Sequence, residues 1–182
     1  MQGDLTMATD NLFKPKLNRR AAAIALLGAG AAISMREDKA VAKNQPVRSA
    51  IPDYDEWQLS DADWKKRLSP EAYAVLRREA TERPGTSDLL NEKRDGIFAC
   101  AGCGLDLFAA ETKYESGTGW PSFYDALPNA IGTKTDYKLI VPRTEYHCAR
   151  CGGHQGHVFT DGPRPTGLRY CNNGVALTFK PA

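Results

Sequence analysis

The sequence predicts a mainly β fold with short helices at its N-terminal side, and three observations support this prediction. From Gly96 onward, short apolar runs alternate with turns rich in glycine and proline, a pattern typical of antiparallel strands. Between residues 60 and 81, apolar residues recur at helical spacing behind capping side chains. Two C-x-x-C pairs, far apart in the sequence, each lie at the end of an expected strand.

Two short helices are expected first. Ser60 begins the sequence S-D-A-D, which resembles a capping box with aspartate in place of glutamate. Pro70 suits the first position of a second helix, whose apolar residues recur to about Thr81. The segment R-P-G-T then ends that helix.

Three apolar runs are predicted to be strands, at residues 97–99, 137–141 and 175–179. The turn sequences G-T-G-W-P, L-P-N-A-I-G and D-G-P-R-P-T-G separate segments of this kind. The C-terminal part of the chain is therefore expected to be mostly antiparallel β.

Residues 1–42 resemble a secretory signal peptide. Basic residues precede an apolar run at 21–35, and Ala40-Val41-Ala42 offers a small-residue cleavage site. The pair Arg19-Arg20 resembles a twin-arginine export signal. The apolar run is shorter than the about 20 residues that a membrane-spanning helix needs. We therefore expect export, to the periplasm; an uncleaved signal anchor or an Ala-rich helix packed on the body are the alternatives.

The charge of the chain divides unevenly. Residues 1–42 hold six of the 24 basic and four of the 22 acidic residues, which leaves 18 of each in the rest. A neutral body lacks the basic surface of a nucleic-acid-binding protein. Residues 43–55 carry two prolines and little apolar periodicity, so we expect a linker there and one domain over 56–182.

The two C-x-x-C pairs are predicted to hold one structural zinc ion through Cys100, Cys103, Cys148 and Cys151. Glycine follows the second cysteine of each pair, which lets backbone N–H groups approach the sulfurs. The long interval means that the ion would clamp two distant segments together. Two disulfides or a redox-active C-x-x-C are the alternatives, although neither requires two matched pairs.

Cys171 is the cysteine outside these pairs, and it is the candidate nucleophile. Arg169 and Asn173 lie two residues away on either side, on the same face of an extended strand. A guanidinium group favours the reactive thiolate, and an amide can orient a reacting oxygen. Taken alone, an odd cysteine is more often an inert buried residue.

His154 and His157 directly follow the second cysteine pair and could converge on one site. Histidine is the side chain best suited to donate a proton near neutral pH; a second metal site or structural hydrogen bonds are the alternatives. Trp120 follows two glycines of a turn, so we expect it to face a cleft and contact a small apolar group. Phe123 is expected in the core.

Four motifs in this order resemble the B-type methionine sulfoxide reductases: C-A-G-C-G, S-G-T-G-W-P-S-F, C-A-R-C-G-G-H-Q-G-H-V-F-T-D-G-P and G-L-R-Y-C-N-N-G. The resemblance covers about residues 57–179. It implies two antiparallel sheets clamped by the four-cysteine zinc site, with Cys171 as nucleophile. It also implies supporting roles for Trp120, His154, His157, Arg169 and Asn173. The implied substrate is the R-epimer of methionine sulfoxide in oxidised proteins.

The resemblance further implies a mechanism. Trp120 would contact the methyl group of the substrate, Cys171 would attack the sulfur, and His157, aided by His154, would protonate the oxygen. Methionine then leaves and Cys171 becomes a sulfenic acid.

Two positions depart from the family pattern. Many members carry a resolving cysteine within S-G-x-G-W, where this chain has Thr118. Because zinc would occupy the other cysteines, we expect thioredoxin, a thioredoxin-like reductase or a small thiol to regenerate Cys171 from outside. The protein is also expected to be a monomer. Gly174 stands where the family often has serine, with no evident consequence. Two other classes remain open: a zinc-ribbon binding module without catalysis, and an exported structural protein held by two disulfides.

Overall fold

The computed structural model describes residues 46–182. The expected signal peptide over 1–42 and the first residues of the expected linker lie outside the described residues. Residues 46–60 include two short 3-10 helices, Arg48–Ala50 and Asp55–Trp57, and Ile51 between them is buried. No helix of the described part of the chain is long and apolar enough to cross a membrane.

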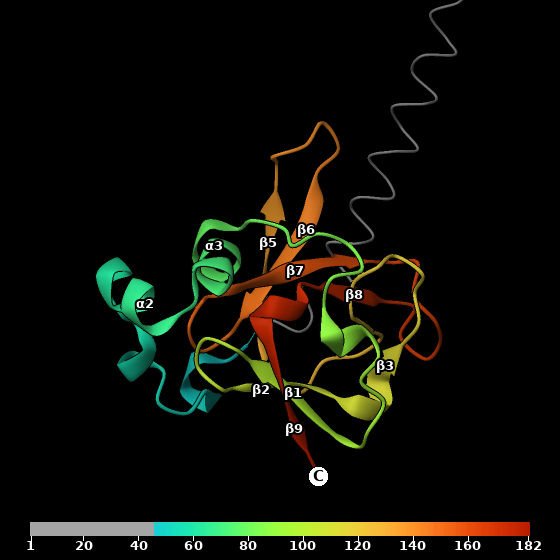
Figure 1. Ribbon diagram of the computed structural model, residues 1–182, viewed down its shortest axis with the longest axis horizontal. Coiled ribbons are helices and arrows are strands. Elements are labelled where there is room, and N and C mark those ends of the chain that lie inside the picture. The colour runs from blue at the N-terminus through green and yellow to red at the C-terminus, as the bar shows by residue number, and fades with distance from the viewer. Residues whose placement is uncertain (1–45) are drawn as a thin grey trace, which may run out of the picture. The chain divides into compact units, whose positions relative to one another are not determined.

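Two antiparallel sheets form most of this fold (Figure 1). A three-stranded sheet has the order β2-β1-β9, and a six-stranded sheet has the order β3-β4-β8-β7-β6-β5. The strands are β1 (Gly96–Cys100), β2 (Asp106–Ala109), β3 (Lys113–Tyr114), β4 (Ser122–Phe123), β5 (Ile131–Asp136), β6 (Arg143–Cys148), β7 (His154–Phe159), β8 (Arg169–Asn172) and β9 (Leu177–Pro181). Short 3-10 helices lie at Asp88–Leu90, Ala110–Thr112 and Gly174–Ala176. The predicted mainly β fold with two antiparallel sheets is confirmed.

The two helices start where the sequence predicts. Helix α2 (Asp61–Arg67) is capped by Ser60, whose hydroxyl accepts a hydrogen bond from the Asp63 N–H. Helix α3 (Pro70–Arg78) has Ser69 as its cap and Pro70 in its first turn. It ends earlier than expected, because Glu79 adopts a left-handed conformation with φ of 55°.

The three strand predictions have different outcomes. The run 97–99 lies within β1, and the run 175–179 lies partly in β9, after the 3-10 helix Gly174–Ala176. The prediction of a strand at 137–141 is wrong: these residues form the loop between β5 and β6. The apolar side chains of this loop are exposed rather than packed in the core, and Ile140 is fully exposed. An apolar run alone does not reveal whether other residues cover it.

Aromatic rings from both sheets form the core between them. Phe108 of β2 stacks on Phe123 of β4 with ring centroids 4.3 Å apart. Tyr146 of β6 and Tyr170 of β8 pack edge to face at 5.4 Å, and Phe98 of β1 contacts Phe123 at 5.0 Å. All five rings are at most 1% exposed, so Phe123 is a core residue as expected. Burial of these rings against one another holds the two sheets together.

Candidate active site and four-cysteine cluster

The four paired cysteines meet in one buried cluster. Their sulfur atoms all lie within 4.8 Å of one another. Cys100 and Cys103 come from the end of β1 and the turn after it, and Cys148 and Cys151 come from the end of β6 and its turn. The cluster therefore joins the three-stranded sheet to the six-stranded sheet.

The sulfur positions fit a tetrahedral metal ion. The Cys100 and Cys151 sulfurs lie 3.7 Å apart, and those of Cys103 and Cys148 lie 3.5 Å apart. A Zn–S distance of about 2.3 Å places tetrahedral sulfurs roughly 3.8 Å apart, whereas a disulfide bond measures about 2.05 Å. All five cysteines are free in this structure. The cluster could hold a metal ion, and it does not have the geometry of two disulfides.

Glycines and one glutamine support the cluster. Gly104 and Gly152 follow the second cysteine of each pair with φ of 74° and 66°, which most other residues adopt only with strain. Their N–H groups donate to the carbonyls of Cys100 and Cys148. The Gln155 amide nitrogen lies 3.5 Å from the Cys100 sulfur. The two glycine N–H groups thus bond to carbonyls of the cysteine turns rather than approaching the sulfurs as expected, and the contact to a sulfur comes from Gln155.

Cys171 lies apart from this cluster, half-buried in a cavity of about 130 Å³. Trp120, His157, Arg143 and Phe159 are among the residues that line the cavity. The cavity thus brings together the predicted nucleophile, the predicted aromatic wall and one of the two predicted histidines, which come from β8, the turn before β4, and β7.

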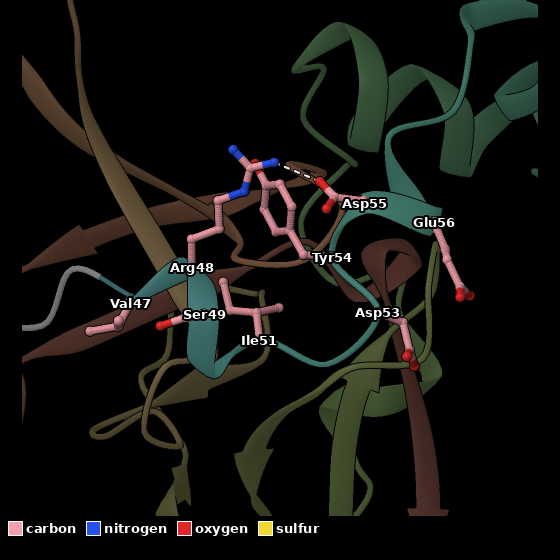
Figure 2. A pocket seen from close by; sticks show the side chains of 8 residues that line it. All are labelled: Val47, Arg48, Ser49, Ile51, Asp53, Tyr54, Asp55 and Glu56. Carbon is pink, nitrogen blue, oxygen red and sulfur yellow. Dashed lines mark hydrogen bonds and ion pairs between the residues drawn. The ribbon is translucent and has the colours of Figure 1, made fainter.

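A larger hollow of about 800 Å³ lies elsewhere, along residues 47–56 (Figure 2). Its lining comes from one short segment, in which Arg48 contacts Asp55 at 2.6 Å and lies over the Tyr54 ring. It contains no cysteine or histidine. The chemistry of the Cys171 cavity, rather than its size, makes it the candidate active site.

Burial raises the pKa of the Cys171 thiol above its ordinary value. The Thr118 hydroxyl, 3.9 Å from the sulfur, and the Arg169 guanidinium both favour the thiolate but do not outweigh burial. Arg169 also forms two hydrogen bonds, of 2.8 and 2.9 Å, with the Asp161 carboxylate, and these fix its position. The expected effect of Arg169 is therefore present, yet the resting sulfur is mainly a neutral thiol at pH 7.

His157 is held by a carboxylate at the edge of the cavity. Its Nε2 lies 2.7 Å from Asp136 Oδ2, which also accepts a hydrogen bond of 2.8 Å from Arg143. Burial lowers the pKa of His157 although Asp136 favours its protonation. Burial opposes ionisation of Asp136, but the Lys138 N–H, His157 and Arg143 outweigh it and lower the pKa of this carboxyl. A neutral imidazole therefore faces a fixed negative charge.

His154 lies behind His157 and does not line the cavity. Its Nδ1 is 2.7 Å from Glu145 Oε1, and both side chains are at most 3% exposed. Burial opposes ionisation of Glu145, yet hydrogen bonds from His147 and His154 lower its pKa to about 2. The prediction that both imidazoles converge holds for their rings, whose centroids are 5.5 Å apart, but only His157 faces the cavity.

A bulge in β7 explains this arrangement. Residues three apart on a regular strand point to opposite faces. Here Tyr146 pairs with Gly156 and His147 pairs with His154, so Gln155 is an extra residue in β7. The bulge returns His154 and His157 to neighbouring positions.

Comparison with known families decides the assignment of the chain. The SelR domain model matches residues 68–181. The chain belongs to the SelR family, that of the B-type methionine sulfoxide reductases. Peptide methionine sulfoxide reductase MsrB of Leifsonia xyli subsp. xyli is 52% identical over 130 residues, which cover 69% of this chain and 94% of that protein. The protein of the same name from Methanosarcina barkeri is 52% identical over 124 residues, 68% of this chain and 87% of that protein. Peptide methionine sulfoxide reductase B1, chloroplastic, of Arabidopsis thaliana is 51% identical over 120 residues, 65% of this chain and 59% of that protein.

In this SelR domain, the Asn173 side chain bonds to two distant backbone segments. Its Oδ1 accepts a hydrogen bond of 2.9 Å from the Glu82 N–H, and its Nδ2 donates one of 2.9 Å to the Gln155 carbonyl. The side chain is 4% exposed. Its amide thus bonds to two backbone segments and fixes the cavity wall, which Asn173 helps to line. Its expected role in orienting a reacting oxygen stays a prediction.

Glu82, which the sequence did not single out, holds the SelR cavity from the other side. Its carbonyl accepts a hydrogen bond of 3.0 Å from Trp120 Nε1. Its carboxylate accepts hydrogen bonds of 3.0 and 2.8 Å from the Gly174 and Val175 N–H groups. Glu82 therefore links the aromatic wall to the segment after Cys171. Glu82, Asp136 and Arg143 carry no motif signal, because Glu82 and Asp136 meet Trp120 and His157 only in the folded chain and Arg143 joins the site through Asp136.

The structure also explains Gly174 of this SelR domain. A Cβ at this position would lie 1.9 Å from the Ser87 hydroxyl and 2.4 Å from the Ser87 Cβ. Ser87 accepts a hydrogen bond from the Leu89 N–H and caps the 3-10 helix Asp88–Leu90. In this chain, Ser87 occupies the space that a side chain at 174 would need.

Proposed function

We propose that this SelR domain reduces the R-epimer of methionine sulfoxide in oxidised proteins to methionine. The observation that carries the proposal is the convergence of Cys171, Trp120 and His157 on one small cavity. The names of the relatives support the reaction class. The cavity, of about 130 Å³, suits the small end of the methionine sulfoxide side chain.

In the proposed complex, the methyl group of the substrate lies on the Trp120 ring, its sulfur faces the Cys171 sulfur, and its oxygen faces His157. The hydrogen bond from Trp120 Nε1 to the Glu82 carbonyl holds the indole in place for this contact. A fixed wall lowers the cost of ordering the substrate.

In the chemical step, Cys171 attacks the sulfoxide sulfur while His157 passes the thiol proton to the sulfoxide oxygen. Asp136 occupies His157 Nε2 and stabilises the imidazolium that forms briefly. The oxygen then moves to Cys171, so methionine leaves and Cys171 becomes a sulfenic acid; the cysteine sulfur is oxidised by two electrons and the substrate sulfur is reduced by two. His154 supports this step through its contact with His157.

Regeneration of Cys171 is proposed to use an external thiol, from thioredoxin, a thioredoxin-like reductase or a small molecule. In the S-G-x-G-W motif, the Thr118 hydroxyl lies 3.9 Å from the Cys171 sulfur, where many members carry a resolving cysteine. The other four cysteines lie in the buried cluster. Two external thiols would return Cys171 to its reduced form with release of water and a disulfide.

The four-cysteine cluster is proposed to hold one structural Zn²⁺ ion. Four thiolates bind zinc in closed sites that stabilise folds without taking part in reactions. The cluster joins both sheets, and none of its four cysteines lines the Cys171 cavity. We also propose that residues 1–42 direct export of the protein to the periplasm, and that it acts there as a monomer.

An epimer-resolved assay tests this function. Purified protein with dithiothreitol should convert the R-epimer of a methionine sulfoxide peptide and leave the S-epimer unchanged. Mass spectrometry after one turnover without reductant should find Cys171 as a sulfenic acid. Activity on the S-epimer alone, or a disulfide between Cys171 and another cysteine of the chain, would contradict the proposal.

A further inference from the structure

The loop between β5 and β6 exposes a cluster of apolar side chains. Within residues 46–182, five large hydrophobic residues are exposed, and four of them belong to this loop. They are Tyr137, Leu139, Ile140 and Val141, with exposed fractions of 75, 56, 102 and 71%. Figure 1 shows the β5–β6 hairpin projecting beyond the rest of the six-stranded sheet. A contiguous exposed apolar patch commonly marks a surface that binds a partner.

The base of this loop is firmly held. Asp136 pairs with Arg143 across the β5–β6 ladder, and their side chains form an ion pair of 2.8 Å. The Lys138 N–H donates to Asp136 Oδ1, and the Lys138 ammonium group binds Glu79 at the end of α3 at 2.6 Å. The apolar tip is therefore presented from a fixed base.

The same base forms part of the Cys171 cavity. Arg143 lines the cavity, and Asp136 binds His157, which lines it too. The loop thus starts after Asp136, which binds a residue of the cavity wall, and ends at Arg143, which belongs to that wall. A polypeptide with one side chain in the cavity would pass beside these residues and reach the apolar tip.

We propose that residues 137–141 bind the apolar polypeptide that flanks methionine sulfoxide in a partly unfolded protein substrate. This inference rests on the proposed function. Methionine is mostly buried among apolar residues, and oxidation makes its side chain polar and disrupts such cores. The segments that flank a methionine sulfoxide are therefore often apolar and newly exposed, which matches the chemistry of the loop.

Two other occupants fit the loop less well. A second copy of the chain would need an interface of about 20–30 residues on each side, far more than this tip supplies. An anionic membrane surface would be attracted by unpaired basic residues. Lys134 and Lys138 both pair with Glu79, at 2.5 and 2.6 Å, which reduces their attraction for lipid headgroups.

The test measures kcat/KM of the full-length protein and of its L139S/I140S/V141S variant on three substrates. The substrates are free methionine-R-sulfoxide, a peptide with leucine and valine around the sulfoxide, and a matched peptide with serine and glycine. The variant should lower kcat/KM for the apolar peptide on the order of 10-fold, mainly through KM. The other two substrates should change less than about twofold. Val47→Ser, which removes the exposed hydrophobic residue outside the loop, is the matched control and should change none of the three.

Fluorescence anisotropy of the labelled apolar peptide separates this inference from the proposed function. If no sulfoxide is reduced but the peptide binds and the loop variant weakens its binding, the proposed function fails and the docking surface stands. Equal losses on all three substrates would overturn the inference, because they would mean that the loop only supports His157. No loss on the apolar peptide, a dimer that the variant dissociates, or vesicle binding that the variant abolishes would overturn it as well.

Discussion

The four-cysteine cluster and the Cys171 cavity are two different cysteine environments, and they differ in what surrounds the sulfur. In the cluster, each sulfur has three other sulfurs within 4.8 Å. In the cavity, Cys171 has a hydroxyl, a guanidinium and open space beside it. Cys171 is partly buried and the cysteines of the cluster are buried, and burial raises the pKa of the Cys171 thiol. Low solvent exposure alone therefore does not distinguish a structural thiol from a reactive one. The neighbours of each sulfur make that distinction: converging thiols bind a metal, and a single thiol beside a histidine and an aromatic ring can react.

Gln155 connects the two environments. Its side chain contacts the Cys100 sulfur, and its carbonyl accepts hydrogen bonds from the Asn173 N–H and side chain. The bulge that makes room for Gln155 also aligns His154 with His157. One irregular residue therefore contacts both the four-cysteine cluster and the wall of the Cys171 cavity.

The largest expected effect is that of Cys171→Ser. Because the serine hydroxyl is a far weaker nucleophile, turnover of methionine-R-sulfoxide should fall on the order of 10³-fold or more. Metal content, measured by elemental analysis, should stay at that of the wild type. Retained turnover would show that the two environments are wrongly assigned.

His157→Ala comes next and should lower kcat on the order of 10²–10⁴-fold, because proton transfer to the sulfoxide oxygen is lost. His154→Ala is the comparison variant. It leaves the buried Glu145 carboxylate without one of its partners, so thermal unfolding should detect a loss of about 3 kcal/mol or more. A larger loss of kcat in His154→Ala than in His157→Ala would reverse their proposed roles.

Cys100→Ser tests the cluster. Loss of one of four ligands should weaken metal binding and lower the free energy of unfolding by more than about 3 kcal/mol. Thermal denaturation with metal analysis measures both. Cys171→Ser is the matched control, and it should unfold within a few degrees of the wild type. A Cys100→Ser protein with unchanged stability would mean that the clamp between the sheets is unnecessary.

A smaller effect is expected from Arg169→Gln. Burial raises the pKa of the Cys171 thiol and Arg169 partly offsets this, so removal of the guanidinium should raise the pKa further. The rate of Cys171 alkylation by iodoacetamide should rise with pH through the alkaline range. In the variant this rise should shift to higher pH, with a rate at pH 7.5 lower by about 10-fold or less. Arg164→Gln is the control, because Arg164 is not among the groups that shift the pKa of Cys171. A shift to lower pH would contradict the geometry.

Gly174→Ser is expected to affect stability, with a loss of about 1–3 kcal/mol in the free energy of unfolding, because the new side chain clashes with Ser87. Adding Ser87→Gly should restore part of this loss, since it removes both clashing atoms. Chemical denaturation of the single and double variants gives the coupling. Additive losses would show that Ser87 is not the reason for glycine at 174. The 3-10 helix Gly174–Ala176 follows Cys171 closely and also contacts the four-cysteine cluster, because the Ala101 N–H in the first cysteine turn donates to the Ala176 carbonyl.

The sequence by itself determined the features that short spacings encode. Ser60 and Ser69 mark both helix starts, the C-x-x-C pairs mark the four cysteines of the buried cluster, and Cys171 is marked by its separation from them. These patterns can be recognised in the sequence because the geometry of a helix cap or of a single C-x-x-C turn depends on neighbouring residues only.

Only the tertiary structure decided which distant residues meet. Asp136 reaches His157 from a different strand, Glu82 reaches Trp120 from a loop, and residues 137–141 are exposed although their composition suits a strand. The physical reason is that burial and charge pairing depend on which segments pack together. A local sequence pattern indicates the chemistry that a side chain offers, and the packing of distant segments determines which partner it contacts.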